Sequence, residues 1–111
     1  MSVRELVASM QRECLTDLTP LRAAHLQTHL AALGGNCAAE IRAREMAYNK
    51  ALNGYIEAHD VSAARATIWA KTTDEYSAWR EAKDTFDLVE QLVISLRALL
   101  RTQQTEMKMS A

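Results

Sequence analysis

Two histidines and two cysteines are the side chains of this sequence best suited to bind a metal ion. His25 and His29 lie four residues apart, a spacing that places both imidazoles on one side of a helix. Cys14 and Cys37 flank them, but in a helical hairpin the two thiols would lie about 15 to 20 Å apart. One zinc ion cannot bind both thiols. We therefore expect no metal and no other cofactor. A metal-binding helical bundle ranks third among our functional hypotheses.

Acidic side chains in the middle of the chain lack the spacing of a catalytic site. Glu40, Glu45 and Glu57 precede His59, yet no Glu-x-x-His pair of the di-iron type is present. The sequence also contains no glycine-rich phosphate loop, no dinucleotide-binding fingerprint and no nucleophile elbow. We therefore expect that the protein is not an enzyme.

Five basic side chains are candidates for contacts with nucleic acid. They form one group in the middle of the chain and one near its C-terminal end: Arg42, Arg44, Lys50, Arg97 and Arg101. The 13 basic and 14 acidic residues nearly cancel, so the positive excess of a general nucleic-acid-binding protein is absent. Binding of nucleic acid by an assembled oligomer, in which the small groups add up, is the second hypothesis.

The composition predicts an all-α protein. Hydrophobic residues make up 49% of the 111 residues and charged residues 24%, which is typical of a small soluble domain. Three glycines and one proline are too few for the turns of a β-rich fold. No apolar run is long enough to span a membrane, and no segment resembles a secretory signal, so we expect a cytoplasmic protein with reduced cysteines.

Two helix starts are expected near the N-terminus. Ser2 and Glu5 have the spacing of a capping box. Thr19 followed by Pro20 is a second start signal, because threonine caps helices and proline suits their first position.

Two adjacent glycines set the expected domain boundary. Gly34 and Gly35 are expected to end the second helix, since glycine is a poor helix former. We interpret residues 1–35 as an N-terminal arm of two short helices that docks on a partner subunit. Residues 36–111 are expected to form a helical hairpin with a long C-terminal coiled-coil helix.

A central helix after Asn36 is expected to have two different faces. The first face has mostly large side chains and includes Ile41, Tyr48, Leu52 and Tyr55. The second face has only small ones, namely Ala43, Ala47, Ala51, Gly54 and Ala58. Small side chains allow a second backbone to approach closely, so we expect this helix to be buried on two sides.

The pattern is ambiguous over residues 59–73. Asp60 or Ser62 would cap a short segment there, although a turn, a kink or continuous helix all fit the sequence. We prefer a break at Thr72, because Thr72 and Glu75 form another capping-box match.

The last helix carries the strongest periodic signal. Its apolar residues repeat at alternating steps of three and four, as in a coiled coil. A helix over residues 73–108 would be about 54 Å long, which short helices cannot cover. We therefore expect a homo-oligomer whose interface includes Trp79, Phe86, Val89, Val93, Leu96 and Leu100.

The charges of this helix indicate how two copies would pair. Its first half is rich in acids and its second half in bases, which also complements the helix macrodipole. In an antiparallel pair, Glu81 and Asp84 would approach Arg97 and Arg101 of the other copy.

The stretch AKTTDEY over residues 70–76 leads into Trp79-Arg80-Glu81-Ala82 and then into the basic end of the long helix. Over residues 38–108 the sequence resembles a loose family of small helical proteins of tailed bacteriophages and prophages. Some of these are encoded near genes for single-strand annealing and replication, so the resemblance implies an accessory role in phage DNA metabolism.

Our main hypothesis is a non-enzymatic helical oligomerisation or assembly protein, encoded by a phage or prophage and not bound to membranes. Its partner would be a second copy of itself, or another phage protein. The alternative is a nucleic-acid-binding accessory factor in phage recombination or replication.

Overall fold

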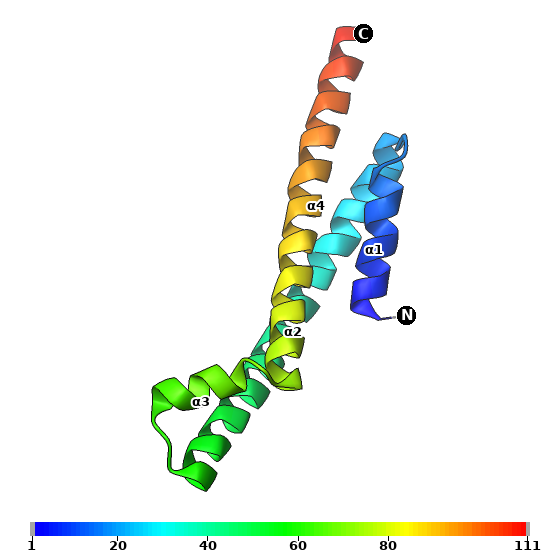
Figure 1. Ribbon diagram of the computed structural model, residues 1–111. Coiled ribbons are helices and arrows are strands. Elements are labelled where there is room, and N and C mark those ends of the chain that lie inside the picture. Colours follow the sequence, from blue (N-terminus) through cyan, green and yellow to red (C-terminus); the bar gives the residue numbers. More distant parts are fainter. Residues whose placement is uncertain (1, 111) are drawn as a thin grey trace. The chain divides into compact units, whose positions relative to one another are not determined.

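The computed structural model describes residues 2–110, and this part of the chain folds into four α-helices without a β-strand (Figure 1). The helices are α1 (Val3–Cys14), α2 (Pro20–His59), α3 (Ala63–Ala70) and α4 (Asp74–Ser110). The prediction of an all-α helical bundle is confirmed. None of these helices is both long enough and apolar enough to cross a membrane.

The first two helix starts lie where the sequence predicts them. The Ser2 hydroxyl accepts a hydrogen bond of 3.1 Å from the backbone N–H of Glu5. The Thr19 hydroxyl accepts one of 3.2 Å from the backbone N–H of Arg22. Each cap satisfies a donor that the first helical turn leaves unpaired, so both starts follow from local chemistry.

The ambiguous stretch over residues 59–73 forms two turns around the short helix α3. Asp60 has a φ of 48°, a left-handed conformation that interrupts the helical path after α2. Ser62 caps α3 through its hydroxyl. The cap of α4 is Thr73, whose hydroxyl accepts from the Tyr76 backbone N–H at 3.3 Å, one residue later than the predicted capping box.

The expected end of the second helix at Gly34 and Gly35 is wrong. α2 is one helix of 40 residues, and neither glycine has the positive φ that ends a helix. An apolar stripe explains the continuity, because Leu30, Leu33 and Cys37 are all buried and follow each other at helical spacing across the glycines. Packing of this stripe offsets the glycine cost of about 1 kcal/mol per residue. The second helix is therefore not short.

The chain divides into two compact units, and α2 and α4 contribute to both. The first unit contains residues up to Asn36 together with those from Thr85 onward. The second unit contains Cys37–Asp84. The N-terminal helices therefore share one core with the end of the chain.

The first unit is a bundle of α1, the beginning of α2 and the later part of α4 (Figure 1). Each of the three helices contributes apolar side chains to the core. The buried ones are Val7, Met10, Ala23, Leu26, Leu30, Leu33, Val89, Leu92 and Leu96. Full burial of one such leucine or valine contributes about 1.5 to 3 kcal/mol, so this core is the main source of stability in the unit.

Polar contacts fix the turn between α1 and α2. The Gln103 side-chain amide on α4 donates a hydrogen bond of 3.0 Å to the Leu18 carbonyl. Arg22 forms a two-pronged ion pair with Glu13, in which Nη2 lies 2.8 Å from Oε2 and Nε donates to Oε1. The hydrogen bond from Arg22 holds the pKa of Glu13 below its usual value.

The second unit contains stacked aromatic rings and buried alanines. Tyr48 stacks on Trp79 with ring centroids 5.1 Å apart, and Tyr55 stacks on Trp69 at 3.9 Å. Three alanines of α3 and α4 are also buried in this unit: Ala66, Ala70 and Ala82. Stacked rings bury much apolar area, which stabilises a unit in which few large residues are available.

The expected burial of α2 on two sides is not found. On the small-residue face Ala43, Ala47, Gly54 and Ala58 are exposed. A Cβ atom added at Gly54 would meet no other atom within 4 Å. Only Ala51 of this face is half-buried, so within residues 2–110 the face is mostly open.

Replacing Gly35 tests the continuity of α2. A Cβ atom at this position would meet nothing within 4 Å, so Gly35→Ala should raise the free energy of unfolding by about 1 kcal/mol through higher helix propensity. Ala32→Gly, at another exposed position of the same helix, should lower it by a similar amount. Urea denaturation measures both changes. A loss of stability in Gly35→Ala would contradict the continuous helix, since it is expected only if the glycine has a left-handed conformation.

Candidate interaction surface

The predicted interface residues of α4 lie largely inside the chain's own bundle. Val89 and Leu96 are each 2% exposed and belong to the core of the first unit. Phe86, Val93 and Leu100 are half-buried. In the second unit the half-buried Trp79 stacks on Tyr48. Val89 and Leu96 are therefore occupied by packing within the chain, whereas Phe86, Val93 and Leu100 remain partly accessible.

The expectation that the other helices are too short to pack along α4 is wrong. α2 has 40 residues and α4 has 37, so both are about 55 to 60 Å long. Within each unit a part of α2 packs with a part of α4. The length of α4 thus no longer requires a second copy.

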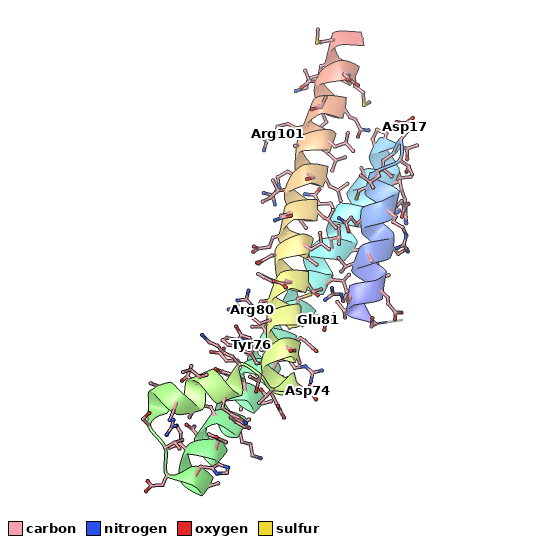
Figure 2. All side chains as sticks on the ribbon, viewed as in Figure 1. Asp17, Asp74, Tyr76, Arg80, Glu81 and Arg101 are labelled. Atoms are coloured by element: carbon pink, nitrogen blue, oxygen red, sulfur yellow. The ribbon has the colours of Figure 1, made fainter. Side chains whose placement is uncertain are left out.

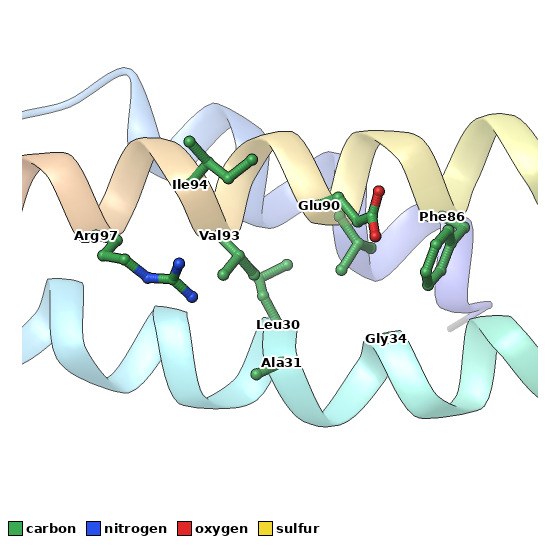
Figure 3. Close-up of a pocket in the computed structure, with 9 residues that line it drawn as sticks. Leu30, Ala31, Gly34, Phe86, Glu90, Val93, Ile94 and Arg97 are labelled. Carbon is green, nitrogen blue, oxygen red and sulfur yellow. The ribbon is translucent and has the colours of Figure 1, made fainter.

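An apolar groove lies between α2 and α4 in the first unit (Figure 3). Its volume is about 380 Å³. Three of its lining residues come from α2 and six from α4, and α1 supplies none: Leu30, Ala31, Gly34, Phe86, Val89, Glu90, Val93, Ile94 and Arg97. Figure 3 shows Phe86 and Arg97 at opposite ends of the groove, with Leu30 and Val93 between them.

Small residues of α2 keep this groove open. Ala31 and Gly34 line it on the α2 side, where larger side chains would fill the space beside Leu30. A Cβ atom added at Gly34 would meet no atom within 4 Å. Since soluble helical bundles pack their interiors densely, an unfilled apolar flank of this kind is a candidate contact surface.

Ile94 is the large exposed apolar residue of the groove. Its exposed fraction is 63%, whereas the neighbouring Val93 is half-buried. Glu90 and Arg97 bracket it on the same helix, and both are exposed. Neither charged side chain has a hydrogen bond or an ion pair within residues 2–110.

The candidate nucleic-acid contacts are exposed but do not form a strong basic patch. In the second unit, Arg42 and Lys50 share α2 with Arg44, whose Nε donates a hydrogen bond of 3.1 Å to Glu40. In the first unit, Arg97 lines the groove and Arg101 is exposed one turn further on.

Asp17 lies in the turn between α1 and α2, and Figure 2 shows Arg101 on the side of α4 that faces away from this turn. The same figure shows Asp74 and Tyr76 at the first turns of α4 in the second unit. Acidic side chains accompany the bases in each unit, so neither basic group dominates the local charge.

The histidines and cysteines do not assemble into a metal site among the described residues. His25 and His29 are exposed on α2. Burial raises the pKa of the Cys14 thiol, and the charge of Glu13 raises it further. Burial also raises the pKa of the Cys37 thiol, and the charge of Glu40 adds to this shift. Within residues 2–110 no three His, Cys, Asp or Glu side chains are grouped so as to hold a metal ion. A raised thiol pKa lowers the fraction of the reactive thiolate at neutral pH.

The sequence predicted part of this surface. Phe86, Val89, Val93 and Arg97 are among the predicted contact residues, and Arg97 is predicted to contact either nucleic acid or the acidic half of a second copy. Leu30, Ala31 and Gly34 were missed because α2 was expected to end at the glycines. Ile94 was missed because it lies one position beyond the apolar repeat.

Comparisons with known proteins add no further assignment. No family model matches the chain, and no curated protein or solved structure is significantly similar to it. Any functional inference therefore rests on the geometry and composition of this surface.

Substitutions at two nearby positions of α4 distinguish a core residue from a groove residue. Leu96→Ala should lower the free energy of unfolding by about 2 to 5 kcal/mol, because it removes a side chain that is 2% exposed. Ile94→Ala should change it by less than about 0.5 kcal/mol at a protein concentration that favours the monomer, because Ile94 is 63% exposed. Urea denaturation checks both values. Similar losses in the two variants would show that Ile94 belongs to the core.

Proposed function

We propose that this chain is a non-enzymatic helical assembly protein that acts by associating with a second copy of itself. The observation that supports this proposal is the α2–α4 groove of the first unit, with Ile94 63% exposed beside it. An apolar groove with few charged residues at its edges has the composition of a protein contact site.

The chemistry of the groove favours binding over catalysis. Its ionisable side chains are Glu90 and Arg97, and it contains no histidine, cysteine or hydroxyl nucleophile. A general acid or base needs a reacting group positioned beside it, and a nucleophile needs an activating base. The lining of this groove provides neither arrangement.

A phage or prophage origin remains a prediction that rests on the resemblance over residues 38–108. Binding of nucleic acid likewise remains the second hypothesis. Retardation of single- or double-stranded DNA that weakens steeply with added salt would favour it.

The proposal predicts a mass that depends on protein concentration. The 12.4 kDa chain should form a dimer or a larger oligomer at micromolar concentrations, which light scattering and sedimentation equilibrium would detect. Ile94→Glu should weaken association at least about tenfold, equivalent to about 1.4 kcal/mol, because it places a charge on the apolar contact. Helicity should be retained, since Ile94 is exposed and glutamate favours helix.

Ile68→Glu is the matched control. Ile68 is 71% exposed on α3 and does not line the groove. This variant should associate like the unmodified chain. A monomeric mass for the unmodified chain across the concentration range would contradict the proposal, and an equal loss in both variants would assign association to general surface hydrophobicity.

A further inference from the structure

We propose that the groove binds the α4 helix of a second copy in antiparallel orientation, with the two-fold axis between Val93 and Ile94. In this arrangement Glu90 of each copy pairs with Arg97 of the other. The inference rests on the proposed self-association and specifies its partner surface, direction and register.

The spacing of the two charges determines this register. Glu90 and Arg97 lie seven residues apart on α4, which is about 10.5 Å or two helical turns, so they project from similar sides of the helix. Their midpoint lies between Val93 and Ile94. An antiparallel pair centred there places each carboxylate opposite a guanidinium of the other copy, and the two-fold symmetry creates this contact twice.

Both charged groups are available for such a contact. Glu90 and Arg97 are exposed, and neither is paired within residues 2–110. A parallel pair in register would instead place Glu90 against Glu90 and Arg97 against Arg97. Like charges at adjacent positions oppose association, so the charges select the antiparallel direction.

The same axis brings apolar side chains together. It places Ile94 of one copy opposite Val93 of the other, beside Leu30 and Ala31 in the groove wall. Ile94 would lose much of its 63% exposure in this position. The apolar contact provides the free energy of association, whereas the flanking charges fix direction and register.

The charge distribution along α4 alone predicts a centre near Val89 to Val93. A centre near Val89 would use a residue that is 2% exposed and already packed in the chain's own core. The exposed part of the helix lies further along, at Ile94. The predicted partners Glu81 and Asp84 are therefore replaced by Glu90 as the acidic contact of Arg97.

Charge reversals test the register. Glu90→Arg and Arg97→Glu should each weaken association about tenfold at low salt, because each converts two attractive contacts into repulsive ones. Mixing the two variants should restore association in a heterodimer with two complementary contacts. The double variant carrying both reversals on one chain should associate like the unmodified protein.

These reversals do not weaken α4 itself. Arg at position 90 would follow Asp87 by three residues, and Glu at position 97 would precede Arg101 by four, and both spacings favour attraction within a helix. Asp87→Arg is the control, because Asp87 is exposed on the same helix and does not line the groove. It should leave association nearly unchanged.

The masses of the variants distinguish the two proposals. If the unmodified chain associates but neither single reversal weakens it, the register is wrong while self-association stands. A parallel pair gives this result, because each single reversal exchanges one like-charge contact for another. If the unmodified chain is monomeric, both proposals fail. Loss of the difference between the variants at about 1 M salt, where charges are screened within about 3 Å, would confirm that the effect is electrostatic.

Discussion

The continuity of α2 through Gly34 and Gly35 is the feature on which the rest of this structure depends. Two adjacent glycines cost helix stability, but the buried stripe of Leu30, Leu33 and Cys37 continues across them at helical spacing. α2 therefore remains one helix and supplies a packing partner for α4 in both units. Gly34 also lines the groove, so the residue that weakens the helix helps to leave its flank open.

The first unit thus uses two neighbouring faces of α4 differently. Val89, Leu92 and Leu96 are buried in the chain's own core. The adjacent side of α4, which includes Ile94, borders the groove and has charged side chains of both signs. An apolar centre flanked by one acid and one base is self-complementary under a two-fold axis, and the proposed pairing with a second copy is based on this property.

Local signals predicted the starts of α1 and α2, but not the extent or partners of the helices. Ser2 and Thr19 act within one turn, so their roles follow from sequence. The end predicted at Gly34 is wrong because tertiary packing overrides helix propensity. Periodicity correctly placed Val89 and Leu96 on a buried face, yet it does not specify what covers that face. Ile94 lies outside the apolar repeat, so periodicity gives no signal for its place beside the groove.

The most direct test of the account is an isotope-filtered nuclear Overhauser experiment on a mixture of labelled and unlabelled chains. Contacts between chains separate association from packing within one chain. The account predicts intermolecular cross-peaks from the Ile94 methyl groups to Val93 and Ala31 methyl groups of the other copy. An associated sample in which the Ile94 methyl groups show cross-peaks only within their own chain would contradict it.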